Sequence, residues 1–319
     1  MAHRSENGMP MAPPVGGSIM AIGDITQVDP DLVEGCWYVD TGMYATEAYG
    51  SVYLLTGEHP ALVETGIGTN HELVLNLLET AGVDRDELAH IVPTHVHLDH
   101  AGGAGFLAEA CPNATLSIHE RAVRHLIDPS RLVAGTKAAV GDQWRHYVDP
   151  EPVPDDRIRP LSDGDVVDLG DRQLEAVEAP GHAPHQHAFH LPSDDAVFTA
   201  DAAGLYVQAS GEVRPTTPPP DFDLEQNLQD IDRLLALEPS VLLYSHFGPA
   251  ADATLLEAYR TVLIEWVDSV ETIREAAPDD ERAIERIVER HAPIEAWGAD
   301  KATSETAMNA RGVFGYLDR

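Results

Sequence analysis

The ten residues Thr94–Gly103 read THVHLDHAGG and place His95, His97, Asp99 and His100 within six positions. Imidazole nitrogens and carboxylate oxygens are the side-chain ligands that zinc and similar divalent ions bind. The preceding residues, HIVP, are mostly apolar, and we expect the strand to run through HIVPTHVH. Alternate residues of a strand share a face, so both histidines of HVH can reach one ion. Asp99 and His100 follow in a turn, and we expect them to point at the position of a second metal ion. The stretch therefore predicts a metal site rather than a solvated polar loop.

Three further candidate ligands follow in comparable settings. His182 lies in the turn of EAPGH, Asp201 ends the apolar run VFTAD, and His246 ends the apolar run LLYSH. In α/β layers, ligands gather where strands end. A lone histidine on a strand is more often structural than a metal ligand. Three such positions in a chain that already holds HxHxDH indicate a shared site.

The composition is dominated by acidic residues. The 319-residue chain has 54 Asp and Glu against 20 Lys and Arg, a formal net charge of −34, and its only lysines are Lys137 and Lys301. Acids spread along a chain with almost no lysine are typical of a halophile, because at molar salt the Debye length falls to about 3 Å and screens the repulsion. The charge also argues against a nucleic-acid partner, since phosphate binding needs clustered Lys and Arg.

The sequence predicts a cytoplasmic protein without a membrane partner. It contains no apolar run of about 18 residues, which a membrane-spanning helix requires. Residues 1–21 are rich in Gly and Pro without a long apolar core, so we expect a mobile tail rather than a signal peptide. Cys36 and Cys111 form no CxxC pair and suggest no disulfide framework.

Residues 22–250 alternate between short apolar runs and helical patterns, which predicts an α/β body. Ser51–Leu55 and Ala61–Gly66 form a hairpin-like pair, and His71–Gly82 reads as a helix ending at glycine. Residues 121–159 are mostly helical and then proline-rich, which is typical of a lid or an insertion.

Residues 251–319 have a purely helical pattern. Apolar residues recur at spacings of three and four from Leu255 to Ile273, which predicts a stripe that packs against the body rather than one that binds substrate. We therefore divide the chain into a tail (1–21), a body (22–250) and a helical C-terminal segment (251–319), whose surface is available for a homodimer interface.

The string THVHLDHAGG, followed in order by APGH, TAD and SHFGP, resembles the metallo-β-lactamase-fold hydrolases over roughly residues 45–250. Within that superfamily it is most similar to the glyoxalase II and lactonase branches. The resemblance implies an α/β fold, an αββα four-layer sandwich with a dinuclear metal site at one edge, here with a helical C-terminal extension.

The resemblance also implies a ligand set. His95, His97 and His182 bind the first ion, Asp99, His100 and His246 bind the second, and Asp201 bridges the two. This nitrogen and oxygen set suits two divalent ions, with Zn²⁺ expected first and iron or manganese as the other metals that accept such ligands.

Some positions depart from the family pattern. The family often has Asp in the early strand where this chain has Glu64, whose longer side chain we expect to support a ligand histidine. The usual GHTPGH reads GHAPHQ here, so His185 and Gln186 replace a glycine and a histidine beside the site. His185 is a candidate for supporting a ligand or facing substrate, with ordinary packing as the alternative. Tyr206 is a candidate for contacting a substrate oxygen, with the same alternative.

The implied chemistry is hydrolysis. Two divalent ions about 3.5–4 Å apart share a bridging water and lower its pKa, and the hydroxide attacks a carbonyl carbon. Asp99 is the candidate catalytic residue, because it can orient the hydroxide and pass a proton onward. No GxSxG motif offers a nucleophilic serine. We therefore predict a hydrolase that cleaves an ester, thioester or lactone in a small-molecule substrate. Loop aromatics, among them Tyr44 and Tyr147, are candidates for shaping its pocket.

Three other functions compete with this one. A persulfide dioxygenase-like enzyme of the same fold would use a single iron on His95, His182 and Asp201. A nuclease is disfavoured by the lack of a basic patch, and a non-catalytic binding protein would be expected to have lost ligands.

The substrate stays open at the level of sequence. A glutathione-type thioester needs basic residues to hold its carboxylates, and the candidates in the helical segment are Arg260, Arg274 and Arg311.

Overall fold

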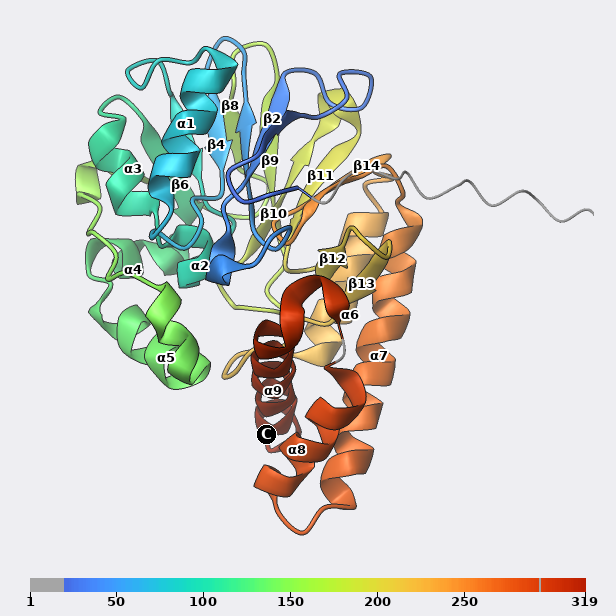
Figure 1. Ribbon diagram of the computed structural model, residues 1–319. Coiled ribbons are helices and arrows are strands. Elements are labelled where there is room, and N and C mark those ends of the chain that lie inside the picture. The colour runs from blue at the N-terminus through green and yellow to red at the C-terminus, as the bar shows by residue number, and fades with distance from the viewer. Residues whose placement is uncertain (1–19, 293) are drawn as a thin grey trace, which may run out of the picture.

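The computed structural model describes residues 20–292 and 294–319. Most of the expected N-terminal tail, residues 1–19, lies outside the described residues. The chain forms two β-sheets packed face to face, and the C-terminal helices extend beyond one end of the sheets (Figure 1).

The first sheet has seven strands that neighbour one another in chain order. They are β1 (Ile25–Gln27), β2 (Cys36–Asp40), β3 (Ser51–Leu55), β4 (Ala61–Val63), β5 (His90–Val92), β6 (Thr115–His119) and β7 (Ile158–Leu161). The pairs from β1 to β4 are antiparallel, which confirms the predicted hairpin of β3 and β4. The pairs from β4 to β7 are parallel, so β4 and β5 end at the same edge of the sheet.

The second sheet has six strands in the order β15-β14-β11-β10-β9-β8. They are β8 (Val166–Asp168), β9 (Gln173–Glu178), β10 (His187–Leu191), β11 (Ala196–Ala200), β14 (Val241–Tyr244) and β15 (Gly248–Ala250). Two short strands, β12 (Leu205–Val207) and β13 (Glu212–Arg214), form a separate hairpin. Because β9 and β11 are both antiparallel to β10, and β14 is parallel to β11, the strands β9, β11 and β14 end at one edge.

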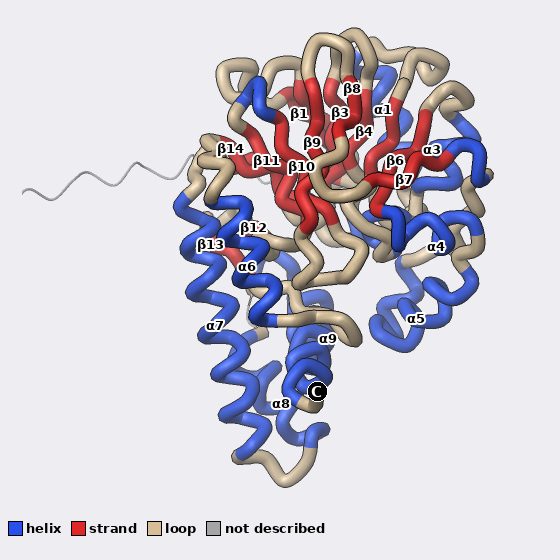
Figure 2. The backbone as a smooth tube through the Cα atoms, turned by 180° about the vertical axis from the view of Figure 1, so that it is seen from behind, coloured by secondary structure: helices blue, strands red, loops and turns tan. Residues whose placement is uncertain are grey.

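Helices cover both outer faces of the two sheets (Figure 2). The α-helices of the described residues are α1 (His71–Ala81), α2 (Leu98–Ala101), α3 (Ala104–Ala110), α4 (Val123–Ile127), α5 (Ser130–Val140), α6 (Leu224–Leu235), α7 (Thr254–Glu275), α8 (Asp280–His291) and α9 (Gly298–Leu317), of which α5, α8 and α9 lie beyond the end of the sheets. The helix predicted over His71–Gly82 is confirmed, and Gly82 closes it in the left-handed conformation that favours glycine.

The apolar side chains separate into layers that match an αββα sandwich. Leu54 and Leu62 of the first sheet pack outward against Leu77 of α1 and Leu107 of α3. Inward-facing residues of both sheets share a second cluster, in which the rings of Tyr53 and Phe198 meet edge to face with centroids 5.4 Å apart. A third cluster joins the outer face of the second sheet to α6 and α7. The predicted four-layer fold is confirmed.

The C-terminal segment packs on the second sheet through the predicted stripe. Leu256, Tyr259, Leu263 and Val270 of α7 are buried in the cluster that includes Leu242 of β14. The expectation that this stripe is core packing is confirmed. The later helix α9 behaves differently, because part of it reaches the cleft described below. In the described part of the chain, no helix has the length and apolarity needed to span a bilayer.

Candidate metal centre

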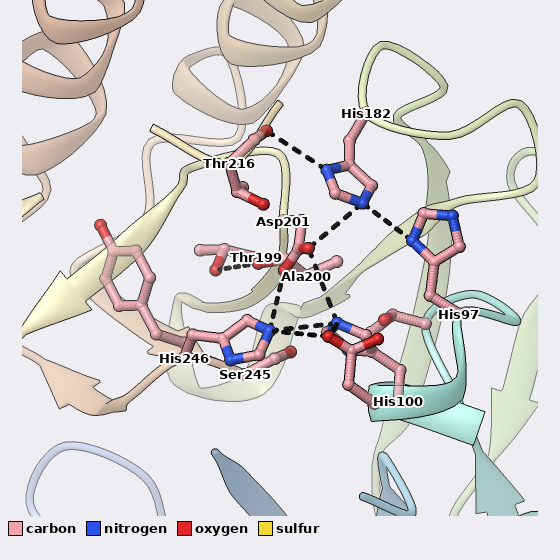
Figure 3. Close-up of polar contacts among 12 residues, drawn as sticks. His97, His100, His182, Thr199, Ala200, Asp201, Thr216, Ser245 and His246 are labelled. Atoms are coloured by element: carbon pink, nitrogen blue, oxygen red, sulfur yellow. Dashed lines mark hydrogen bonds and ion pairs between the residues drawn. The ribbon is translucent and has the colours of Figure 1, made fainter. Parts of the chain in front are cut away.

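All seven predicted ligands lie beyond the ends of strands, Asp99 and His100 in the short helix α2 and the other five in loops. His182 follows β9, Asp201 follows β11 directly, and His246 lies two residues after β14. At Asp201 the pairing of β11 with β14 shifts register, and Ala200 has a positive φ of 49°, so the chain turns sharply as the strand ends. Because these strands end at one edge, residues far apart in sequence meet there, as Figure 3 shows.

The expectation that His95 and His97 lie on one strand is wrong. Strand β5 ends at Val92, and the next residue, Pro93, has no N–H to donate to a neighbouring strand. His95 lies in the loop, and His97 immediately precedes α2. The two imidazoles still converge, but the loop and not the strand period brings them together.

The first group of ligands consists of His95, His97 and His182. Nε2 of His95 and Nε2 of His182 lie 3.0 and 3.1 Å from Nδ1 of His97. The ligand nitrogens of a tetrahedral zinc ion are separated by about 3.3 Å, given Zn–N bonds of about 2.0–2.1 Å. The spacing of this group therefore fits one ion.

The second group consists of Asp99, His100 and His246. Nε2 of His100 lies 3.2 Å from Nε2 of His246, and Oδ2 of Asp99 lies 4.0 and 3.9 Å from these two nitrogens. The side chain of Asp99 is 23% exposed, whereas both histidines are almost fully buried. Asp99 is thus the member of this group that faces solvent.

Asp201 lies between the two groups. Its Oδ2 is 3.2 Å from Nε2 of His182 and 3.6 Å from Nε2 of His100, and its Oδ1 is 3.7 Å from Nε2 of His246. That Oδ1 is buried and has no hydrogen-bond partner among the described residues. Burial raises the pKa of Asp201, but the three histidines lower it below its ordinary value. An unpartnered, ionised carboxylate among converging nitrogens fits a bridge between two cations.

Glu64 supports the second group, as its position in the sequence predicted. It follows β4 and is buried, with a positive φ of 72° that turns the chain toward the site. Its Oε1 accepts hydrogen bonds from Nδ1 of His100 at 3.0 Å, Oγ1 of Thr94 at 2.6 Å and Oγ of Ser245 at 2.7 Å. A carboxylate on Nδ1 leaves Nε2 of His100 free for a metal and fixes the ring.

Main-chain carbonyls orient two other ligands. Nδ1 of His182 donates to the carbonyl of Thr216 at 3.4 Å, and Nδ1 of His246 donates to the carbonyl of Tyr49 at 3.0 Å. In each case the opposite nitrogen, Nε2, turns toward the cluster, as Figure 3 shows. Neither Thr216 nor Tyr49 has a sequence signal, because any residue type supplies a carbonyl.

The other two residues predicted near the site, His185 and Tyr206, differ in whether they line the cleft over the ligands. His185 lines the same cleft as the ligands, and its ring centroid lies 5.5 Å from that of His97. Burial, followed by the charge of His97, lowers the pKa of His185 to about 2, so the ring is neutral. Gln186 is buried and holds the ligand loops, since it accepts from the N–H of Asp201 and donates to the Ala179 carbonyl. Tyr206 does not line the cleft. Its ring stacks on Tyr244, with centroids 5.3 Å apart.

The cleft over the ligands has a volume of about 440 Å³. Its walls come from α4, α5, α9 and the loop 216–221, so the segment 121–159 and the C-terminal helix both contribute. Tyr44 and Tyr147 also line it. Their hydroxyl groups are hydrogen-bonded to each other, and the Tyr44 hydroxyl lies 3.4 Å from Oδ2 of Asp99. Burial and then the Asp99 charge raise the pKa values of both tyrosines, which stay protonated.

A buried ion pair on α9 was not predicted. Lys301 lies 2.7 Å from Glu305, and its ammonium lies 3.5 Å from the ring centroid of Tyr44 and 4.2 Å from that of Tyr49. The Tyr49 hydroxyl donates to Glu305 at 2.9 Å, while the Tyr49 carbonyl holds His246. One signal was available, because Lys301 is one of only two lysines in the chain and lies four residues before a glutamate.

Comparison with known proteins gives the same picture of the core. The family model described as the metallo-beta-lactamase superfamily matches residues 45–246. The metallo-beta-lactamase fold-containing protein ST1585 of Sulfurisphaera tokodaii is 27% identical over 218 residues, which are 67% of this chain and 78% of that protein. The crystal structure of ST1585 superposes with a TM-score of 0.69 at 22% identity, covering 88% of this chain and 98% of the other, so the two share a fold.

Several relatives are named as thioesterases, and two of them serve as examples. The bovine acyl-coenzyme A thioesterase MBLAC2 is 29% identical over 188 residues, which are 53% of this chain and 64% of that protein. The atrochrysone carboxyl ACP thioesterase dmxR1 of a Cryptosporiopsis species is 24% identical over 179 residues, 56% of this chain and 45% of that protein. The chain therefore spans less than two thirds of either thioesterase.

Proposed function

The chain belongs to the metallo-beta-lactamase superfamily, and on that basis we propose that it is a dinuclear metal-dependent hydrolase of a small-molecule thioester, with esters and lactones as related substrates. The observation that carries this proposal is the pair of complete ligand groups with the unpartnered Oδ1 of Asp201 between them. When bound, the two ions supply activation of a water molecule and polarisation of the substrate carbonyl.

The side chains around the ions have separate tasks. His95, His97 and His182 would hold one ion, and Asp99, His100 and His246 would hold the other, and both groups contribute residues to the cleft wall. Asp99 faces the cleft, and its pKa is below the ordinary value because His100 and His246 outweigh the effect of burial. As an ionised carboxylate it accepts the proton of the attacking water and returns that proton to the departing thiolate, which leaves as a thiol.

Tyr44 holds Asp99 in this role. Its protonated hydroxyl lies beside Oδ2 of Asp99 and beside the Tyr147 hydroxyl, at the wall of the cleft. A hydrogen bond to the carboxylate orients it and favours its ionised form. The hydrolysis then forms one C–O bond and breaks one C–S bond, with the proton of water ending on sulfur.

The choice of a thioester rests on the relatives. Several of them, including MBLAC2 and dmxR1, are named as thioesterases. Oxygen esters and lactones undergo the same attack on a carbonyl carbon, so the geometry of the ligands alone does not separate the three classes. The glyoxalase II-like and lactonase-like assignments remain proposals of the same kind.

The test is metal content followed by a substrate panel. Protein purified without added metal is expected to hold two divalent ions per chain, and to hydrolyse at least one thioester in a set that also includes an oxygen ester and a lactone. One iron per chain, together with oxygen uptake on a persulfide, would instead replace this proposal with the dioxygenase alternative.

A further inference from the structure

Residues 121–147, which we call the basic segment, reverse the charge of the chain. Against the overall net charge of −34, this segment has a surplus of three positive charges. Its basic residues are Arg121, Arg124, Arg131, Lys137 and Arg145, and its acidic residues are Asp128 and Asp142. A strongly acidic surface repels anions, so a local reversal of sign beside a cleft raises the local concentration of anionic ligands.

Two of these residues, Arg124 and Arg131, line the cleft over the metal ligands. Both side chains are exposed, and neither forms an ion pair with any acidic group in the described part of the chain. The one hydrogen bond of the Arg124 side chain within the described residues is donated by Nε to Nε2 of the neighbouring His125, at 3.2 Å. Burial and the Arg124 charge lower the pKa of His125, so that ring is neutral and the guanidinium keeps its charge unpaired.

The other basic residues of the segment are occupied or lie elsewhere. Lys137 pairs with Asp149 and Arg145 pairs with Asp300. Neither of the two lines the cleft, and Arg121 lines a separate depression. The positive charge at the cleft is therefore that of Arg124 and Arg131.

The acidic groups of the cleft do not cancel this charge. Asp99 and Asp201 belong to the ligand cluster, where bound metal ions would neutralise them, and Glu305 is paired with Lys301. Asp221 is the other acidic residue of the cleft wall. Guanidinium groups bind phosphate and carboxylate groups in the same forked geometry, so an exposed pair of arginines suits either anion.

The wall beside the arginines is apolar and helical. Leu132, Gly135, Thr136, Ala139 and Val140 of α5 all line the cleft, and their spacing of three, four, seven and eight residues places them on one face. Met308 of α9 lines the same cleft. This surface offers contacts for an uncharged acyl chain, so an anionic group of the substrate belongs to its thiol part.

We propose that Arg124 and Arg131 bind an anionic group on the thiol part of the substrate and select anionic over uncharged thioesters. This inference rests on the proposed thioesterase function. The anion is a phosphate or a carboxylate, and the α5 face contacts the acyl chain. The arginines of the C-terminal segment do not serve this purpose. Arg260 and Arg274 pair with acidic residues, and Arg311 lines a neighbouring cavity instead.

The test uses binding as well as turnover. Calorimetry on the zinc-loaded protein compares three thioethers that cannot be hydrolysed: S-hexyl-coenzyme A with phosphates, S-hexylglutathione with carboxylates, and uncharged S-hexyl-N-acetylcysteamine. At least one anionic thioether is expected to bind at least about tenfold tighter than the uncharged one. The tighter of the two identifies the anion. The preference should shrink between about 0.1 M and about 1 M salt, as the Debye length falls from about 10 Å to about 3 Å.

A matched pair of variants assigns the effect to the cleft. R124E/R131E should remove the preference, with a loss of kcat/KM that is larger for an anionic thioester than for an uncharged one, and R124Q/R131Q should be intermediate. K137E/R145E changes the net charge of the same segment by the same amount outside the cleft and should keep the preference.

Three results would overturn the inference: equal affinity for all three thioethers, an equal loss of preference in K137E/R145E, or an equal loss of activity on charged and uncharged thioesters in R124E/R131E. A wild-type protein that prefers the anionic thioethers but hydrolyses no thioester would contradict the proposed function and leave the anion site intact.

Discussion

The two ligand groups differ in how the rest of the molecule holds them. In the first group, His95 contacts the hydroxyl of the adjacent Thr94, and His182 contacts the main-chain carbonyl of Thr216. In the second group, His100 is held by the buried carboxylate of Glu64. His246 is held by the Tyr49 carbonyl, and the same Tyr49 is bonded through its hydroxyl to α9.

Burial is similar in the two groups, because each has one partly exposed ligand and two buried histidines. His97 of the first group and Asp99 of the second are partly buried, whereas the other four ligands of the two groups are almost fully buried. Enclosure excludes water and strengthens electrostatic interactions, but it also requires that every polar group be satisfied by a partner. The second group meets that requirement through residues of β4, the loop before β3, and the C-terminal helix. It should therefore depend on distant substitutions more than the first group does.

The largest expected effect comes from removing the residue common to both groups. Asp201→Ala deletes the carboxylate between the two sets of nitrogens, so both ions should be lost together with all measurable hydrolysis. His97→Ala should give the same loss from the first group. Metal content by mass spectrometry, with circular dichroism to confirm folding, checks this. Retention of full activity in metal-free buffer by either variant would contradict a dinuclear site.

A selective effect is expected from Glu64→Gln. The amide keeps the size of the side chain but removes the negative charge that accepts from His100. Loss of such a partner typically weakens metal binding by about 10–100-fold. Competition with a chelator should show a larger loss for the ion of the second group, because Glu64 contacts His100 directly and reaches His95 only through Thr94. A uniform weakening of both ions would mean that the two groups are not held independently.

A smaller effect is expected from Lys301→Met, which leaves Glu305 buried without its cation and loosens the contact to Tyr49. Affinity for the second ion should fall by about three- to tenfold, less than for Glu64→Gln, because the effect passes through Tyr49 to His246. The other lysine supplies the control. Lys137→Met removes an exposed charge, and it should change neither metal affinity nor melting temperature.

The loop that bears His182 has its own sensitivity to pH. The N–H of Gly181 donates to the buried carboxylate of Asp230 at 2.6 Å. Burial raises the pKa of Asp230 from 3.8 to about 6, although the bonds from Gly181 and Gln226 oppose the rise. A raised pKa means that the stability contributed by this group is present below pH 3.8 and is lost as the pH rises through 6.

Asp230→Asn should remove that dependence. As the pH rises from about 4.5 to about 7.5, the wild type should lose stability that the variant keeps. The unfolding free energy of the variant relative to the wild type should therefore rise by at most about 3 kcal/mol. Denaturant unfolding of the metal-free protein at both pH values measures it. If the difference between the two proteins does not change with pH, Asp230 is ionised at both values.

Most of the fold and the ligand cluster followed from local sequence signals. The ligands were predictable because each sits next to a short apolar run or a glycine turn, and such runs end at one edge of an α/β layer. The structure brings all seven predicted ligands together, with Glu64 beside them, and metal binding by them stays a prediction. The strand at His95 was predicted too long, because Pro93 ends it.

The cleft was much less predictable. Lys301 and Glu305 lie about two hundred residues from Asp99 in the chain, and nothing in the helical pattern of α9 indicates that one turn reaches the site. The same holds for Arg124 and Arg131, which look like ordinary surface residues until the structure places them on the cleft. Tyr206 illustrates the opposite case, since it is near a ligand in sequence and stacks on Tyr244 in space.

The sequence by itself determined which residue types were available for chemistry and which strand ends would carry them, because strand and turn signals depend on neighbours in the chain. Only the tertiary structure decided which ligands became buried and which stayed partly exposed, and which charges were left unpaired beside them. The physical reason is that burial, pairing and cleft shape depend on contacts between residues distant in sequence. The energetic effect of a charge likewise depends on the groups around it.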